Sequence, residues 1–419
     1  MRMRVAVLCF ASAACQYRQH GDYSGAVASG AAPDASRSPL DSAEDSTEVR
    51  ARGDEAGNSS SMDDAAPPAR SEAGASPCQA ADCSSARPVM LADGFHHACA
   101  LMSDGTVRCW GTNGSRELGS SVPGGHATHP VVVPGIAGAT AIAAAADVLS
   151  GGHTCAVVGG GGVRCWGDNS VGQLGNQTTT PWLGPVEVKW LTGVSRLSCA
   201  HDHSCAVSSD GKAHCWGDNS AGQLGDGTNL STTWPVATST LNDAVAVAVT
   251  TRASCAATRG GSVMCWGEGR SNVPELVPSL AAVTALAAQA QMFCALAAGG
   301  VQCWNSGVPP TPGAIPGLVG ITSVAAGRAH ACALDTAGVV RCWGMNSAGQ
   351  LGNGGTEPVE TPVPVATIGR AVAIGAGGDH TCAIMAGDGS VWCWGENAQG
   401  VLGSDGPPFS STPLRIPGF

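Results

Sequence analysis

Residues 205–217 read Cys-Ala-Val-Ser-Ser-Asp-Gly-Lys-Ala-His-Cys-Trp-Gly, with two cysteines ten positions apart and a glycine between them. The same arrangement occurs seven times between Cys99 and Trp394, and its first cysteines are 38 to 56 residues apart. Each unit also contains a small-residue segment before the first cysteine and a Pro-Val segment beyond the Trp-Gly. Four short strands at this period are typical of a propeller blade. The sequence therefore predicts an all-β fold, a seven-bladed β-propeller with four-stranded blades.

The composition favours a turn-rich chain without long helices. Only 13% of the residues are charged, whereas 59 of the 419 are glycine and 25 are proline. The formal net charge is −11, and the repeats contain no basic stripe. Because nucleic-acid binding needs Lys and Arg to displace counterions, we expect no nucleic-acid partner. No nucleophile elbow, phosphate loop or His-Glu-x-x-His motif occurs, so we expect no enzyme activity and no cofactor.

The paired cysteines are predicted to form one disulfide in each repeat. A three-residue turn at 103–105 sets Cys99 opposite Cys109, and opposite residues of an antiparallel pair are within disulfide reach. Pairs nine and eleven residues apart fit a shorter and a longer turn. Free thiols packed as small core residues are the alternative. The predicted pairs are Cys99–Cys109, Cys155–Cys165, Cys205–Cys215, Cys255–Cys265, Cys294–Cys303, Cys332–Cys342 and Cys382–Cys393.

The first 77 residues differ from the repeats. Residues 1–14 combine a basic start with an apolar run and small residues, which is typical of a secretion signal. Ser-Ala-Ala before Cys15 resembles a lipobox, so we expect acylation of Cys15, with simple cleavage as the alternative. Residues 15–77 are poor in large apolar side chains and are predicted to be a disordered acidic tether. The folded domain is predicted over 78–419, where Cys78 and Cys83 are candidates for a local bridge.

Several motifs resemble the repeats of the regulator of chromosome condensation family. Residues 327–334 read Gly-x-x-His-x-Cys-Ala-Leu, and residues 346–352 read Asn-x-x-Gly-Gln-Leu-Gly. The resemblance fades in the fourth and fifth units, which lack the Gly-Gln-Leu-Gly turn and replace the repeat histidine with Ala253 and Met292. It implies a seven-bladed propeller, here of a bacterial exported, cysteine-containing type.

The ends of the repeat region predict how the ring closes. Residues 88–91 form the small-residue strand of the first unit, whereas residues 412–417 match the Pro-Val strand that precedes the other units. We therefore expect the ring to be closed by N- and C-terminal strands that share one blade, which would leave no exposed terminal sheet edge.

The regularly placed aromatic and histidine side chains are interpreted as structural. The tryptophan after each second cysteine is predicted to pack between blades. Each repeat histidine is predicted to fix its blade through a hydrogen bond. One segment offers metal-ligand types at alternate positions, but two of its members are already repeat residues, so no metal site is predicted. Its four residues are Cys199, His201, His203 and Cys205.

The polar loops after the Gly-Gln-Leu-Gly turns are the predicted functional part. Loops of equivalent position should gather on one face of a propeller, where Trp182 and Trp234 are candidate interface anchors. We therefore expect a monomeric, exported, lipid-anchored scaffold that binds a protein or a surface glycan. Its expected place is the bacterial outer membrane or cell surface, with the periplasm as the alternative. Inhibition of an exported enzyme and polysaccharide cleavage are the alternative functions, and nucleotide exchange on the GTPase Ran is not expected.

Overall fold

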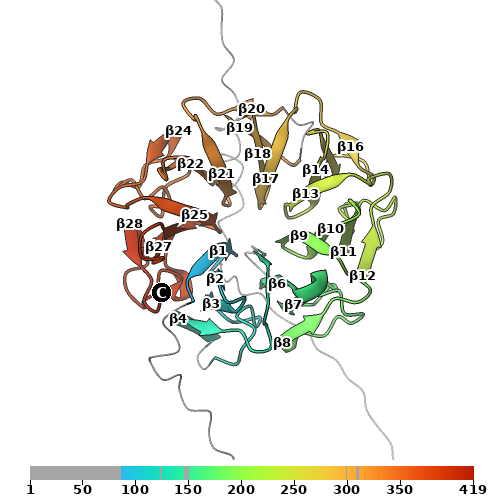
Figure 1. The fold of residues 1–419 in the computed structure, drawn as a ribbon, viewed down its shortest axis with the longest axis horizontal. Coiled ribbons are helices and arrows are strands. Elements are labelled where there is room, and N and C mark those ends of the chain that lie inside the picture. The colour runs from blue at the N-terminus through green and yellow to red at the C-terminus, as the bar shows by residue number, and fades with distance from the viewer. Residues whose placement is uncertain (1–85, 123–124, 146–150, 299, 308–310) are drawn as a thin grey trace, which may run out of the picture. The chain divides into compact units, whose positions relative to one another are not determined.

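The computed structural model describes residues 86–122, 125–145, 151–298, 300–307 and 311–419, which belong to one compact unit spanning Ser85–Phe419. The predicted signal segment, Cys15, the tether 15–77 and the Cys78–Cys83 bridge lie outside the described residues. Seven antiparallel sheets of four strands are arranged around a common axis (Figure 1). The predicted seven-bladed β-propeller is therefore confirmed. Within the described ranges, no helix has the length and hydrophobicity needed to cross a bilayer.

The strands of each blade follow one another in the chain. The first blade contains β1 (Pro88–Asp93), β2 (His97–Met102), β3 (Val107–Thr112) and β4 (His126–Val132). The second contains β5 (Ala141–Ala144), β6 (His153–Val158), β7 (Gly162–Gly167) and β8 (Trp182–Glu187), with the 3-10 turn η2 (Gly159–Gly161). The third contains β9 (Val194–Ala200), β10 (His203–Ser208), β11 (Ala213–Gly217) and β12 (Thr232–Ala237). The fourth contains β13 (Ala244–Val249), β14 (Ala253–Thr258), β15 (Val263–Gly267) and β16 (Glu275–Leu276).

The remaining three blades repeat this order. The fifth contains β17 (Val283–Gln289), β18 (Met292–Ala297), β19 (Gly300–Asn305) and β20 (Gly313–Ala314). The sixth contains β21 (Ile321–Ala326), β22 (His330–Asp335), β23 (Val340–Gly344) and β24 (Val359–Pro364). The seventh contains β25 (Ala371–Ala376), β26 (His380–Met385), β27 (Val391–Glu396) and β28 (Phe409–Arg415), with η3 (Ala398–Gly400). Blades four and five, which lack the Gly-Gln-Leu-Gly turn, therefore have outermost strands of only two residues.

Every repeat hairpin is closed by a disulfide between directly opposite residues. Cys205 faces Cys215 in the β10–β11 register, and their Cα atoms are 4.1 Å apart. In the first blade Gly105 ends the three-residue turn with φ of 78°, a left-handed conformation that glycine adopts without strain. The seven predicted cysteine pairs are the seven disulfides of the structure. Bridges of this density are typical of proteins from an oxidising compartment.

The hydrophobic core lies between neighbouring blades. One such layer contains Leu224 from the third blade, Val249 and Trp266 from the fourth, and the Cys205–Cys215 bridge. The repeat tryptophans are buried, as are the leucines at the equivalent position of five turns, Leu118, Leu174, Leu224, Leu351 and Leu402. Because each blade buries one face against each neighbour, stability depends on the boundary between blades.

The predicted closure by a shared blade is wrong. All four strands of the first blade come from residues 88–132, and β28 pairs with β27 of its own blade. The Pro-Val segment is the fourth strand of its own unit and does not precede the next one. Side chains close the ring instead: Trp110 Nε1 donates to the Val401 carbonyl at 2.8 Å, and Phe419 packs edge-on against Trp110.

Candidate functional site

The connections between strands define two faces of the ring. We call loop face the side that carries the first-to-second and third-to-fourth strand connections. We call hairpin face the side that carries the second-to-third strand turns and the connections from each blade to the next. The two kinds of hairpin-face segment are joined by hydrogen bonds, such as Ser209 N to the Gly193 carbonyl and Arg259 N to the Asp243 carbonyl. The Gly-Gln-Leu-Gly turns and the polar loops lie on the loop face.

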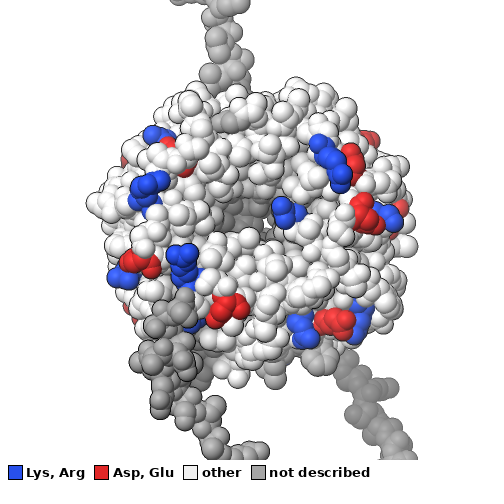
Figure 2. Space-filling model, in the orientation of Figure 1, with Lys and Arg blue, Asp and Glu red and all other residues white. Residues whose placement is uncertain are grey.

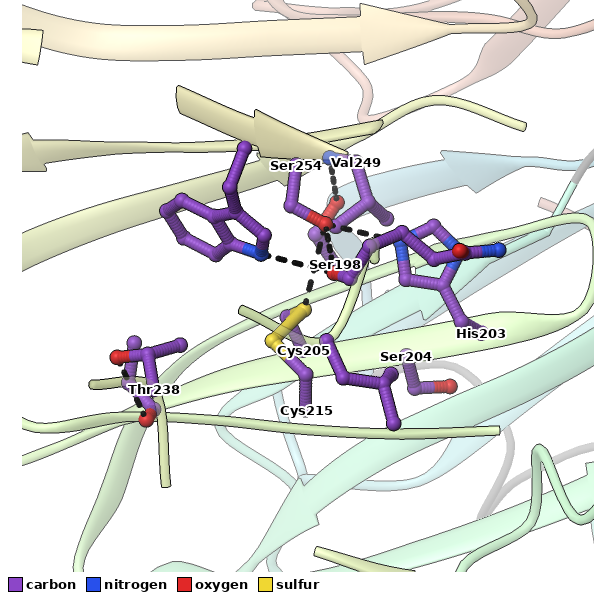
Figure 3. The surroundings of a disulfide bond; sticks show 12 residues. Ser198, His203, Ser204, Cys205, Cys215, Thr238, Val249 and Ser254 are labelled. Atoms are coloured by element: carbon purple, nitrogen blue, oxygen red, sulfur yellow. Dashed lines mark hydrogen bonds between the residues drawn. A yellow bond between two sulfur atoms is a disulfide. The ribbon is translucent and has the colours of Figure 1, made fainter. Parts of the chain in front are cut away.

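The repeat histidine of one blade bonds to a hydroxyl of the next. His203 Nε2 lies 3.0 Å from Ser254 Oγ, which donates to the Gln223 carbonyl at 2.8 Å (Figure 3). The same carbonyl accepts the indole N–H of Trp266. Since the hydroxyl proton is used on the carbonyl, His203 donates from Nε2. The Gly-Gln-Leu-Gly turn is therefore the acceptor that ties successive blades together.

Four boundaries share this network. The histidine–hydroxyl pairs are His97–Thr154 at 3.0 Å, His153–Ser204 at 2.7 Å, His203–Ser254 at 3.0 Å and His330–Thr381 at 2.8 Å. Burial is the main cause that lowers the pKa of His97, His153 and His203 to about 3 and that of His330 to about 4. These histidines are locked, buried and uncharged, so they hold the blades together and are unsuited to proton transfer with a ligand.

The polar loops are held by one asparagine each. Asn219 Oδ1 accepts from the Leu224 amide at 2.9 Å, and its Nδ2 donates to the carbonyls of Thr228 and Leu230. The equivalent asparagines Asn169, Asn346 and Asn397 do the same in their blades. The asparagine therefore fixes the backbone of each loop, and the variable side chains of the loop project from this fixed backbone.

Ionisable groups with shifted pKa values gather on the loop face where the sixth, seventh and first blades meet. His96 Nδ1 lies 3.5 Å from Glu396 Oε2. Burial is the main cause that lowers the pKa of His96 to about 4, and burial together with Asp379 raises the pKa of Glu396. Arg328 forms a two-point ion pair with Asp379 and lies over the Phe95 ring at 5.8 Å. This sector is the strongest candidate for a charged contact site on the loop face.

A cavity of about 200 Å³ adjoins this sector, lined by His96, His97 and Glu117 among others. Glu117 stands where other units have glutamine, and burial raises its pKa. Its Oε2 accepts from the Ser115 amide at 2.9 Å, as Gln173 Oε1 accepts from the Val171 amide at 3.0 Å. Glu117 therefore performs the structural role of the repeat glutamine, and it is the one carboxylate among the described residues that line the cavity.

Family models for the regulator of chromosome condensation (RCC1) repeat match residues 160–207, 210–257 and 338–384, and a second model of the same repeat matches 94–116, 194–223, 321–350 and 371–401. The chain contains RCC1 repeats. The unmatched stretch 258–320 contains the fifth blade, which lacks both the histidine and the turn.

Individual relatives share only part of this RCC1 repeat chain. Human E3 ubiquitin-protein ligase HERC2 is 37% identical over 110 residues, which is 25% of this chain but only 2% of that protein. The RCC2 homolog of Danio rerio is 41% identical over 63 residues, or 15% of this chain and 12% of that protein. Among solved structures, Prp20p from Saccharomyces cerevisiae superposes with a TM-score of 0.63 at 19% identity, covering 80% of this chain and 88% of that one. Human WBSCR16 gives a TM-score of 0.61 at 21% identity, covering 71% and 86%. These structural likenesses establish the fold.

The predicted anchors Trp182 and Trp234 lie outside the polar loops. Trp182 is the first residue of β8 and is paired with Gly167, whereas Trp234 lies inside β12. Both are therefore on outermost strands, at the rim of the ring. Trp234 is 44% exposed. Sequence reasoning extended the loops too far, because the outermost strand begins before the Pro-Val pair.

The four metal-ligand types of residues 199–205 do not share one strand. The RCC1 repeat turns between β9 and β10, so Cys199 pairs with Ser204 across the turn. His201 Nδ1 lies 2.6 Å from Asp202, and Cys205 is in a disulfide. Cys199 is buried, and burial raises the pKa of its thiol to about 12. The neighbouring sulfur of Cys155 is also disulfide-bonded, so this thiol has no set of co-ligands.

Proposed function

We propose that this chain is an exported, lipid-anchored, non-catalytic scaffold that binds a protein partner through its loop face. The observation that carries the proposal is the charge of that face. Its connections and adjoining strand ends contain twelve described acidic residues, of which Asp93, Glu117, Asp168 and Asp379 are buried, and four basic ones. The acidic residues are Asp93, Glu117, Asp168, Asp202, Asp218, Asp226, Glu268, Glu357, Glu360, Asp379, Glu396 and Asp405, and the basic ones are Arg116, Arg252, Arg270 and Arg328.

This asymmetry favours a partner with a basic surface. Charge complementarity speeds association and sets orientation, and rigid loops reduce the entropy lost on binding. Glu357 and Glu360 on the sixth blade are exposed and extend the acidic surface to the rim. Yeast Prp20, a propeller of similar fold, is described with binding properties to Gsp1p and histones and has been solved bound to Kap60, and these are protein partners of that propeller. We propose a binding role for this chain as well, with Trp182 and Trp234 at the rim of the contact.

The export and anchoring steps rest on the N-terminal sequence and on the disulfides. Acylation at Cys15 would place the mature N-terminus at a membrane, and the tether 15–77 would separate it from the ring. The expected mature chain begins at an acylated Cys15. Mass spectrometry of the N-terminal peptide tests this step, and an unmodified N-terminus in mature protein would contradict it.

Site-specific photocrosslinking tests the binding face. A crosslinker at Glu357 on the loop face should capture a partner from envelope extracts, and Glu357→Lys with Glu360→Lys should reduce recovery. The matched control is Glu275→Lys, an exposed acidic residue of β16 on the outermost strand of the fourth blade. Removal of Trp182 and Trp234 together should weaken the same complex. Equal recovery with the loop-face and control variants would refute the proposal.

A further inference from the structure

Trp190 adopts a backbone conformation that its side chain does not suit. It belongs to the connection between the second and third blades and has φ of 57°. The equivalent position is a glycine in three connections (Gly135, Gly317 and Gly418) and a small polar residue in three others (Thr240, Ser279 and Thr367), all with positive φ. Positive φ strains a bulky residue, and such strain persists where something else compensates for it.

Folding supplies no compensation for this strain. The indole of Trp190 is 74% exposed, and it makes no hydrogen bond to any described residue. Replacement of Trp190 by glycine would therefore remove no hydrogen bond and little buried surface within the described residues. An exposed tryptophan kept in a strained turn indicates a binding role.

The other exposed apolar side chains share the face of Trp190. Eight of the eleven large hydrophobic residues exposed in the described ranges lie on hairpin-face connections or at strand ends beside them. They are Val89, Val132, Trp190, Val245, Leu276, Val319, Val339 and Val372. Val319 is 83% exposed in the connection that corresponds to that of Trp190. These residues come from blades all around the ring, so a compact partner seated on one sector could not contact them together.

The hairpin face also has the opposite charge balance to the loop face. Its connections and strand ends contain ten basic and seven acidic residues, and Figure 2 shows basic side chains distributed around the ring. The basic residues are Arg87, Arg108, Arg164, Lys189, Arg196, Lys212, Arg259, Arg341, Arg370 and Arg415, and the acidic ones are Asp104, Glu187, Asp210, Asp243, Glu275, Asp335 and Asp388. Four of these basic residues pair with acidic residues of the same face: Lys189 with Glu187, Lys212 with Asp210, Arg341 with Asp335 and Arg415 with Asp388. The remaining excess of basic residues favours orientation of this face toward a negatively charged surface.

We propose that the hairpin face docks flat on an anionic lipid surface, with Trp190 inserted at the level of the headgroups. A bilayer is broad and planar enough to meet apolar residues spread around the whole ring. Tryptophan is favoured at membrane interfaces, and basic side chains are attracted by anionic headgroups. The acidic loop face would then point away from the membrane. This docking goes beyond the proposed function, because it needs neither the acyl chain nor a protein partner.

Vesicle sedimentation tests the docking with the full chain carrying Cys15→Ser, which removes the acyl anchor. Vesicles of phosphatidylcholine with one quarter phosphatidylglycerol should pellet the protein at low salt, and pure phosphatidylcholine should pellet much less. Trp190→Gly should weaken binding roughly tenfold, since affinity follows the buried apolar area. The same variant should melt at a higher temperature than wild type, so lost binding could not reflect misfolding.

The matched control is Trp234→Ala, an exposed tryptophan on the outermost strand of the third blade that should bind like wild type. Added salt should weaken the binding of every variant, because screening shortens the reach of the basic residues. No pelleting with anionic vesicles, equal binding by Trp190→Gly, or equal losses in both tryptophan variants would overturn the docking. Crosslinking from Glu357 reports on the loop-face partner separately, so either proposal can fail alone.

Discussion

Mild acid should destabilise the propeller through its buried histidines. Burial lowers the pKa of His97, His153 and His203 to about 3 and that of His330 to about 4. In the unfolded chain each would titrate near its ordinary value of about 6.5. The unfolded state therefore binds more protons below pH 6.5, and stability must fall as the pH decreases from there toward the folded pKa values. Above pH 7 these four histidines contribute no pH dependence.

As long as the pH stays above the pKa values of the folded state, the loss of unfolding free energy depends only on the histidine pKa in the unfolded chain. At pH 5.0 each locked histidine should cost about 2 kcal/mol relative to pH 7.5. Four independent sites would lower the free energy of unfolding by about 8 kcal/mol, which is an upper bound because the boundaries are coupled. Glu117 acts in the opposite direction between its ordinary and its raised pKa, since protonation relieves its burial.

Denaturant unfolding of the oxidised chain at pH 7.5, 6.5, 5.5 and 5.0 measures this effect. His203→Gln keeps a side-chain donor for Ser254 but cannot titrate, so its slope of stability against pH should be smaller by about 1.4 kcal/mol per pH unit near pH 5. His129→Gln changes an exposed histidine and should leave the slope unchanged. Constant stability between pH 7.5 and 5.0, or identical slopes in both variants, would refute the assignment of locked neutral histidines.

Three further predictions concern single side chains. Trp216→Phe should lower stability by about 1 kcal/mol more than Trp343→Phe in parallel melts, because the Trp216 indole donates to a turn carbonyl whereas Trp343 Nε1 is buried without a described partner. Ser254→Ala should cost about 1–3 kcal/mol by chemical denaturation, since it leaves His203 Nε2 without its acceptor. Alkylation of the unfolded but unreduced chain should modify Cys199 and no other cysteine of residues 86–419; modified repeat cysteines in the mass spectrum would contradict the seven bridges.

The hairpins could be predicted from the sequence because a disulfide between two cysteines restricts how the two strands pair. A disulfide demands opposite residues, so the spacing between Cys294 and Cys303 dictates a two-residue turn, and that between Cys382 and Cys393 a four-residue one. The sequence does not show in the same way which strand begins each blade. A periodic order of four strands can be divided at any point, and nothing in the period assigns the Pro-Val strand to the unit before it. The predicted shared blade failed for this reason.

The charged sector and Trp190 were missed for a second reason. Both differ from the repeat at positions where the effect of the side chain depends on the backbone conformation and on which blades are in contact. Alignment of the connections between blades would have placed Trp190 opposite Gly135 and Gly317, which is a visible signal. Its strain and exposure, however, arise from the left-handed turn and not from the residue type. The pairing of His96 with Glu396 joins the first blade to the seventh, and the period carries no information about which ends meet.

The departures from the repeat differ between blade boundaries. Where Ala253 replaces the histidine of the fourth blade, the next blade has Phe293 in place of the hydroxyl, and Phe293 stacks on a tryptophan of its own blade. At the boundary between the seventh and first blades the hydroxyl position is Ala98 although the histidine is kept, and His380 Nε2 lies buried 3.4 Å from Asp93 Oδ1 without a hydrogen-bond partner among the described residues. A histidine without its hydroxyl would leave a buried donor unsatisfied, which costs more than losing both. The residue types are therefore constrained by the hydrogen bonds across each boundary between blades, and less by the single blade. The loop face and the hairpin face can consequently vary freely, provided that each turn still offers its carbonyl to the next blade.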